Sequence, residues 1–405
     1  MKKLEIGIEV VPSHAFGRSF VEGVSKFAAQ QKDWKLRALQ QETATNEALR
    51  KCDGVIMRAF GDSLDKFAAS SGIPVVDVNC ETDYPHLAQI SVDESACGKM
   101  AAEFFLSRRY PNFGFCGISS ARYSDSLRDA FCKALHKAGF PTNVYTPSAL
   151  LPGSDYDNPY RAPDRARVLK WLKSLPKPIA ICCSNDNRAY QVMDIALKAG
   201  MAIPNDVAIL GCDNDAMLCT FAPVPISSID SDPFKLGYSA ARILDALIRR
   251  RQSRKAHRPY WVSPKAIVER ESTEHYPIDP PWLSDALLLI EKDLSRGVAA
   301  RDVFELSGHS PPHVEKTFKQ HLGVSVQTYI TTLRMKKALS LLNKRQLSAK
   351  EVAFACGYAS PQYFSRAFKD YYGKSPLSST MIKEPPRALK VPGTSGSRPR
   401  FRRDN

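Results

Sequence analysis

The sequence predicts an α/β region of two lobes, followed by an all-α region that contains two helix-turn-helix units. Short β-branched runs alternate with longer amphipathic segments up to about residue 270. Roughly ten such runs are more strands than one open sheet comfortably holds, which favours two sheets. After Trp282 the sequence shows only helical periodicity, and part of it is duplicated.

Six pairs of a strand and a helix stand out in the alternation. The pairs are 4–11 with 19–31, 54–57 with 64–70, 74–78 with 94–109, 113–117 with 126–138, 179–183 with 187–199, and 207–211 with 234–251. Alternation of this kind predicts parallel sheets that are covered by helices on both faces.

The basic charge of the chain is concentrated in its C-terminal third. Residues 283–405 carry 21 Lys and Arg against 10 Asp and Glu, whereas the residues before them carry 36 against 32. High net charge can serve solubility alone, but solubility does not require this asymmetry, whereas nucleic-acid binding requires basic residues in one place.

A Pro-rich polar stretch at 274–281 marks the domain boundary. We predict one domain at 1–275, a linker at 276–282, a second domain at 283–385 and a basic disordered tail at 386–405.

Cysteine usage and the N-terminus indicate the compartment. Nine of the ten cysteines precede residue 220, mostly in apolar runs, and neither a CxxC motif nor a Cys/His cluster at metal spacing occurs. The N-terminus does not resemble a signal peptide, and no run of about 18 apolar residues exists. We therefore expect a cytoplasmic protein that needs no membrane, metal or cofactor.

The duplication appears when the C-terminal region is shifted against itself by fifty residues. The matched pairs are Phe304/Phe354, Ser310/Ser360, Pro311/Pro361, Phe318/Phe368, Lys319/Lys369, Gly323/Gly373 and Ser325/Ser375. Each copy is predicted to form a short helix, a turn at Gly308 or Gly357, and a second helix that begins with Ser-Pro. The serines can cap these helices, and proline suits the first helical position.

The second helix of each copy is amphipathic. Val314 and Phe318, like Phe364 and Phe368, are four residues apart and predict a buried stripe. We predict that the opposite faces contact DNA, through Pro312, Glu315, Lys316 and Lys319 in the first copy and Gln362, Ser365, Arg366 and Lys369 in the second. For any one of these residues a solvated surface position would be the better interpretation, but the repeated cap, turn and stripe favour recognition helices.

Between the copies, Ser325 to Leu342 predicts a long helix that holds the two units at a fixed spacing. With the motifs Leu333-Arg334, Gly357-Tyr358, 363–369 and 373–376, residues 283–380 resemble the AraC/XylS family DNA-binding domain. The resemblance implies a transcriptional regulator that binds an operator in double-stranded DNA, with RNA polymerase as a further partner.

The loops that follow the predicted strands of the α/β region hold polar side chains. Ligands of such folds lie at the carboxyl ends of strands. The candidate ligand-binding residues there are His14, Arg18, Arg58, Asn79, Arg128, Asn185, Asp186 and Asp213. Carboxylates, guanidiniums and amides together suit a polyhydroxyl ligand, although single residues of this kind more often form caps or surface ion pairs.

Residues 3–270 also resemble the periplasmic-binding-protein-like fold of LacI/GalR-type regulators. The matching residues include Asn185-Asp186, Gly200, Ile203-Pro204, Gly211 and Asp213-Asn214. Joined to an AraC-type domain, this resemblance implies a sensor for a small sugar, xylose or a related pentose, in a homodimer.

Two other functions are alternatives to this interpretation. A DNA-repair alkyltransferase with an AraC-like domain would need a reactive cysteine in a basic, partly exposed setting, whereas Cys182-Cys183 lies in a strand-like run. A sugar-binding protein without regulatory function would not need the two helix-turn-helix units. The sequence contains no G-x-G-x-x-G, Walker A, H-E-x-x-H or G-x-S-x-G motif, so we expect no enzyme.

Overall fold

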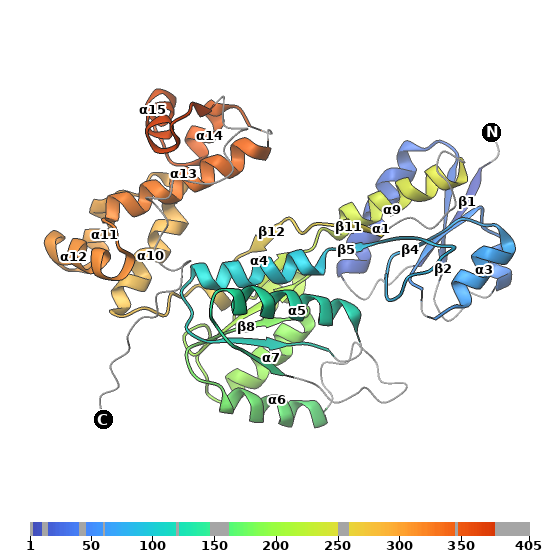
Figure 1. The fold of residues 1–405 in the computed structure, drawn as a ribbon, viewed down its shortest axis with the longest axis horizontal. Coiled ribbons are helices and arrows are strands. Elements are labelled where there is room, and N and C mark those ends of the chain that lie inside the picture. Colours follow the sequence, from blue (N-terminus) through green and yellow to red (C-terminus); the bar gives the residue numbers. More distant parts are fainter. Residues whose placement is uncertain are drawn as a thin grey trace. The chain divides into compact units, whose positions relative to one another are not determined.

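Figure 1 shows the chain as a computed structural model. The structure describes residues 3–9, 15–39, 46–59, 61–118, 121–145, 162–249, 259–344 and 347–376. The chain divides into two compact units, of which the first comprises Met1–Phe105 with Asn112–Thr273 and the second comprises Leu106–Pro111 with Glu274–Asn405. His14 and the predicted tail at 386–405 lie outside the described residues.

The first unit contains two six-stranded sheets, which confirms the predicted two-lobed α/β architecture. The first sheet has the order β11-β5-β4-β3-β1-β2, and all its strands pair in parallel. Its strands are β1 (Leu4–Glu9), β2 (Trp34–Leu39), β3 (Gly54–Met57), β4 (Val75–Asp77), β5 (Ala88–Val92) and β11 (Tyr260–Val262). Parallel strands place their carboxyl ends at one edge of the sheet.

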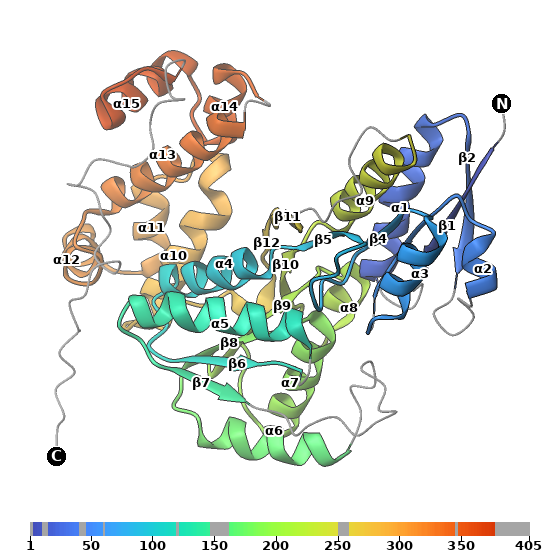
Figure 2. The same cartoon turned by 45° about the vertical axis from the view of Figure 1, so that its right-hand side comes forward.

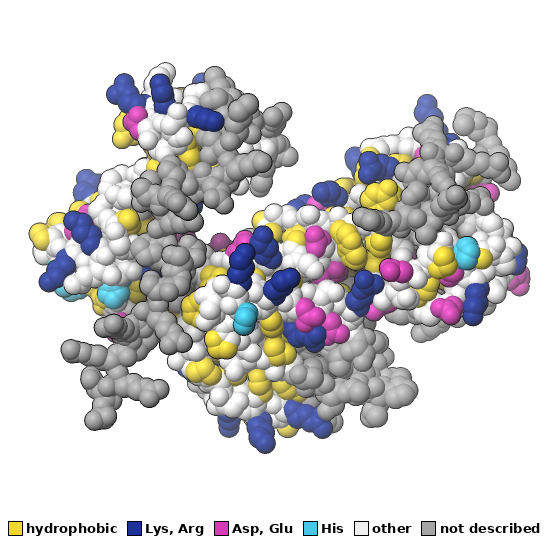
Figure 3. Space-filling model, viewed as in Figure 1, with side chains coloured by type: hydrophobic (Ala, Val, Ile, Leu, Met, Phe, Trp, Pro, Cys, Tyr) yellow, Lys and Arg dark blue, Asp and Glu magenta, His cyan; other side chains and the backbone are white. Residues whose placement is uncertain are grey.

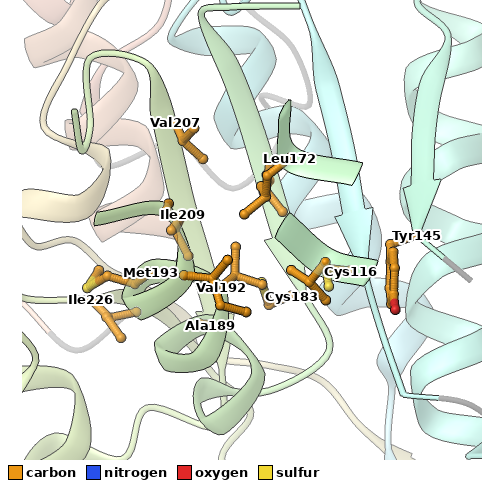
Figure 4. Packing of buried hydrophobic residues seen from close by; sticks show 14 of the residues in the cluster. Cys116, Tyr145, Leu172, Cys183, Ala189, Val192, Met193, Val207, Ile209 and Ile226 are labelled. Atoms are coloured by element: carbon orange, nitrogen blue, oxygen red, sulfur yellow. The ribbon is translucent and has the colours of Figure 1, made fainter. Parts of the chain in front are cut away.

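The second sheet has the order β12-β10-β9-β8-β6-β7, with β12 antiparallel to β10. Its strands are β6 (Phe113–Cys116), β7 (Thr142–Tyr145), β8 (Ile179–Cys183), β9 (Val207–Cys212), β10 (Ser227–Asp230) and β12 (Ala266–Val268). Figure 4 shows the core against this sheet, where Val192 and Met193 pack beside Cys183 and Ile209. Such a continuous apolar layer explains the unbroken hydrophobic runs of β8 and β9.

Helices cover both faces of the two sheets (Figure 2). They are α1 (Ala15–Gln30), α2 (Asn46–Arg50), α3 (Ser63–Ser71), α4 (Glu94–Ser107), α5 (Arg122–Lys137), α6 (Ala162–Ser174), α7 (Asp186–Lys198), α8 (Ala216–Phe221) and α9 (Pro233–Ile248), with a 3-10 turn η2 at Glu271–Thr273. Helices α1 and α9 approach closely because Gly23 faces the Phe234 carbonyl and Gly237 faces the Phe20 carbonyl, where a Cβ atom would overlap the oxygen. None of the described helices is long and apolar enough to cross a membrane.

The second unit is helical, as predicted. Its elements are α10 (Pro281–Asp293), η3 (Leu294–Arg296), α11 (Ala300–Ser307), α12 (Pro311–Leu322), α13 (Val326–Lys344), α14 (Ala349–Ala355) and α15 (Pro361–Tyr372). Val314, Phe318, Phe364 and Phe368 are all fully buried, which confirms the apolar stripes of both second helices. The second unit has two hydrophobic cores, and the first is formed by α10, α11, α12 and the start of α13. Tyr276 is 2% exposed and packs in this first core, although it lies in the segment predicted as a linker.

The two predicted serine caps differ. Ser360 accepts a hydrogen bond from the Tyr363 amide at 3.3 Å, whereas the Ser310 side chain makes no capping bond. In the first copy the two residues after Ser310 are prolines, which have no N–H. The first available amide, that of His313, donates to the Ser310 carbonyl at 2.9 Å instead.

A matched pair of glycines tests how the second unit is packed. Gly308 and Gly357 occupy the two turns, with φ of 66° and 76°, but a Cβ at Gly357 would overlap the Leu294 carbonyl whereas nothing lies within 4 Å of one at Gly308. Gly308→Ala should cost about 1–2 kcal/mol through backbone strain, and Gly357→Ala about 1–3 kcal/mol more through steric overlap. Hydrogen exchange of α11–α15 amides measures the loss, and equal protection in the two variants would contradict this packing.

Candidate effector cavity and DNA-binding faces

A cavity of about 250 Å³ lies between the two lobes of the first unit. Its lining comes from the carboxyl ends of strands of both sheets, such as Glu9 and Met57 in one lobe and Ser184 and Cys212 in the other. This volume is below the roughly 300–1,000 Å³ of pockets for drug-sized ligands, so the cavity suits a small molecule.

In the first lobe the polar part of the cavity is built around Arg58 and Glu9. The Glu9 carboxylate is 4% exposed, and it accepts bonds from the Arg58 amide at 2.7 Å and from its guanidinium Nη2 at 2.8 Å. The Asn79 side-chain amide donates to the Ala59 carbonyl at 3.2 Å, and Asn79 also lines the cavity. This pairing fixes the Arg58 guanidinium at the wall.

In the second lobe Asn185, Asp186 and Asp213 line the cavity. Asp186 is 3% exposed and accepts bonds from the Ser228 hydroxyl and, at 2.7 Å, from the Asp215 amide. Burial, and next the charge of Asp213, raise the pKa of Asp186 well above its usual range. The Asp213 carboxylate accepts from the Ser231 hydroxyl at 3.0 Å.

Two further polar groups of the cavity were not among the predicted residues. Glu94, the first residue of α4, lines it, and burial followed by the negative charges of Asp213 and Asp93 raises the pKa of Glu94 to about 8. The Ser184 hydroxyl lines it as well, is 2% exposed, and has no hydrogen-bond partner among the described residues. The rule that selected the other residues, a position just after a strand, could have found both, since each lies within two residues of a strand end.

One part of the cavity wall is apolar. Phe16 and Phe20 on α1, Tyr123 and Leu127 on α5 and Leu218 on α8 contribute to the lining. Aromatic and aliphatic walls with a few convergent polar groups are typical of small-molecule sites.

The structure brings together five of the eight predicted ligand-binding residues. Arg58, Asn79, Asn185, Asp186 and Asp213 line the cavity. Arg18 is exposed on α1 and does not belong to the lining. Arg128 is likewise outside the lining, and it pairs with Asp125 at 2.6 Å and Asp129 at 2.8 Å.

Cys182 and Cys183 are fully buried in β8. Burial raises the pKa of both thiols well above the usual range, so neither is the reactive thiolate that an alkyltransferase requires.

The predicted DNA-contacting residues lie on the outer faces of α12 and α15. The exposed members are Pro312, Lys316, Lys319, Gln362, Ser365, Arg366 and Lys369. In Figure 3, Lys and Arg side chains are visible at the position that α15 has in Figure 1. Tyr363, which was not among the predicted DNA contacts, is 64% exposed beside Gln362.

Glu315 differs from the other predicted DNA contacts. It is half-buried, and its carboxylate accepts a hydrogen bond from the Val326 amide at 3.4 Å, at the start of α13. An acidic group at a helix N-terminus stabilises that helix, so Glu315 has a structural partner within the domain.

Comparison with known proteins identifies both parts of the chain. Residues 102–273 match the model of a periplasmic binding protein-like domain, and residues 305–379 match that of a helix-turn-helix domain. The chain is 26% identical over 372 residues to the xylose operon regulatory protein of Escherichia coli K12, covering 89% of this chain and 93% of that protein. Over 117 residues, 29% of this chain and 36% of the relative, it is 30% identical to the HTH-type transcriptional regulator GlxA of Rhizobium meliloti.

Solved structures show the same fold. The xylose-binding transcription activator xylR matches with a TM-score of 0.59 and 24% identity over 94% of this chain and 98% of that one. A LacI family regulator from Enterococcus faecalis with bound ribose matches with a TM-score of 0.54 and 18% identity over 68% of this chain and 100% of that one. The chain therefore combines a periplasmic binding protein-like domain with a helix-turn-helix domain, and over most of its length it is similar to a transcription regulator of the xylose operon.

Proposed function

We propose that a small sugar, xylose or a related pentose, binds in the cavity and controls how α12 and α15 bind operator DNA. The observation that carries this proposal is the set of hydrogen-bonding groups around the cavity, in a chain that also holds two exposed recognition helices. The similarity to a xylose operon regulator supports the choice of sugar.

The sugar would be held by groups from both lobes. Each hydroxyl of a sugar donates and accepts a hydrogen bond, so it can use the carboxylate of Asp213 and the amides of Asn79 and Asn185. The Arg58 guanidinium supplies charged donors at the opposite wall. A ligand that contacts both lobes favours their closed arrangement, and this preference is how binding can change the state of the chain.

On DNA, the N-terminal parts of α12 and α15 would enter successive segments of the major groove. Gln362 and Arg366 have the donors and acceptors to recognise adenine and guanine. Lys316, Lys319 and Lys369 would neutralise phosphates. We further propose that the regulator acts in the cytoplasm as a homodimer on its operator and contacts RNA polymerase there.

The first test separates base recognition from phosphate contact. Arg366→Ala should weaken binding to a specific operator by about 1–3 kcal/mol more than binding to random duplex, because a base contact is worth that much in discrimination. Lys369→Ala, one helical turn away, is the matched control and should weaken both alike. Titrations at one fixed salt concentration measure this, and equal losses for Arg366→Ala on both duplexes would refute the assignment.

The second test concerns the sugar. Asp213→Asn keeps the size of the side chain but replaces a carboxylate acceptor, and it should weaken sugar binding by about 1–3 kcal/mol, or roughly 5- to 150-fold. Arg128→Ala, a change on α5 outside the cavity lining, should leave affinity unchanged. Calorimetry with xylose, arabinose and ribose tests both. Absence of heat from every pentose, or equal affinities in wild type and Asp213→Asn, would count against the site.

A further inference from the structure

The hydroxyl of Ser184 is a buried polar group of the cavity wall that has no partner in the described part of the chain. Ser184 lines the cavity and is 2% exposed, and its Oγ makes no hydrogen bond to any residue that the structure describes. A hydroxyl that gives up its bonds to water and gains none in return costs free energy, so such groups are rare in folded proteins. This position therefore calls for a partner that enters the cavity.

The main chain on both sides of Ser184 is held in place. Ser184 directly follows β8, and its amide donates to the carbonyl of Cys116 on β6 at 3.2 Å. The next residue, Asn185, caps α7, because its Oδ1 accepts a hydrogen bond from the Arg188 amide at 2.8 Å. These bonds fix the point at which the Ser184 side chain leaves the sheet, at the wall of the cavity.

Neighbouring polar side chains of the same lobe have partners within the protein. The Asn185 side-chain amide donates to the Tyr123 hydroxyl at 3.3 Å. The Ser231 hydroxyl, also in the lining, donates to the Asp213 carboxylate at 3.0 Å. Bonds of this kind hold the wall together, whereas no bond of the described residues uses the Ser184 hydroxyl. Its presence is explained by a role in binding rather than in the stability of the lobe.

The chemistry of the hydroxyl indicates what suits it as a partner. A serine hydroxyl donates one hydrogen bond and also accepts, and a hydroxyl of a ligand does the same, so the two can pair in either direction. An apolar group in the same place would leave Ser184 buried without a partner. A site built to bond a hydroxyl therefore rejects an analogue that lacks it far more strongly than an apolar pocket rejects a missing methylene.

We propose that Ser184 binds one hydroxyl of the effector and is the residue by which the cavity rejects the corresponding deoxy sugar. This inference rests on the proposed sugar-sensing function and adds to it a specificity-determining residue. The sensor then distinguishes a fully hydroxylated pentose from a deoxypentose that differs from it by a single oxygen atom.

The test removes the two members of this pair of hydroxyls separately and together, in the full chain. The probes are D-xylose and four analogues that lack one hydroxyl each, namely 1,5-anhydroxylitol and 2-, 3- and 4-deoxy-D-xylose, titrated by calorimetry. In wild type the analogue without the Ser184 partner should bind at least about tenfold more weakly than xylose. In Ser184→Ala the penalty for this one analogue should shrink at least about fivefold, while the penalties for the other three stay as they are.

Ser231→Ala is the matched control. Ser231 is 1% exposed and lines the same cavity, but its hydroxyl is already bonded to Asp213. Its loss can change the affinity for every probe, but it should preserve the penalty of the analogue that Ser184→Ala relieves.

A second measurement distinguishes a ligand contact from a structural one. Ser184→Ala removes a hydroxyl that has no partner to lose among the described residues, so the melting temperature of the ligand-free chain should not fall. Ser231→Ala breaks a bond within the lobe and should lower the melting temperature.

Each failure has its own signature. Equal penalties in wild type and Ser184→Ala for all four analogues would overturn the inference, since water rather than the ligand would then complete the bonding of the hydroxyl. A lower melting temperature of ligand-free Ser184→Ala would overturn it too, because the hydroxyl would have a partner in the chain. Both results leave sugar binding itself intact. Binding of neither xylose nor any analogue to the wild type would overturn the proposed function, and this inference with it.

Discussion

The cavity depends on buried carboxyl groups that hold its loops in place, and Asp77 shows the constraint most clearly. Asp77 is fully buried at the end of β4, where an unpaired charge would be very costly. One of its oxygens accepts from the amides of Ala59 and Asn79, and the other accepts from the Cys80 amide and the Gln89 side chain. Because all four donors must stay in place, the loops after β3 and β4 are fixed before any ligand arrives.

Asp186 has the corresponding role in the second lobe. It joins α7 to Ser228 of β10 and to the loop at Asp215, and Gly211 makes room for it, since a Cβ there would overlap the carboxyl oxygen. Each lobe therefore presents a preformed half of the site. Little of the free energy of ligand binding is then lost in ordering loops. It can instead favour one arrangement of the two lobes over another.

The sequence predicted the buried strands better than the edge strands. Residues 179–183 correspond to β8, a continuous apolar run, but β2 was missed because Lys35 and Arg37 interrupt its pattern at the edge of its sheet. Strands β11 and β12 have three residues each, too few to show a period.

The prediction of site residues was limited by side-chain direction. Phe16 and Phe20, four residues apart, face the cavity from α1, whereas Arg18 is two residues from each and so points about 200° around the helix. The same applies on α5, where Tyr123 and Leu127 form the lining and Arg128 lies on the neighbouring face. The ends of the predicted strands showed which loops meet at the cavity. Which side of each helix faces the cavity could be determined only from the structure.

Helices α12 and α15 are built alike but are not chemically equivalent. Helix α13 belongs to both helical cores, through Tyr329 and Ile330 in the first and Met335 and Ala338 in the second, so one helix sets the spacing of the two units. At the second position of α12 stands Pro312, which has neither an amide N–H nor a polar side chain, whereas Gln362 at the same position of α15 offers an amide group.

This difference predicts that the two helices have different roles in DNA binding. A helix that has prolines at its start and lysines along its exposed face is suited to holding the phosphate backbone. A helix that exposes Gln362 and Arg366 has the donors and acceptors to distinguish bases. If α12 and α15 bind DNA as we propose, sequence discrimination should be concentrated in the half-site of α15, and the half-site of α12 should tolerate more base changes at similar affinity.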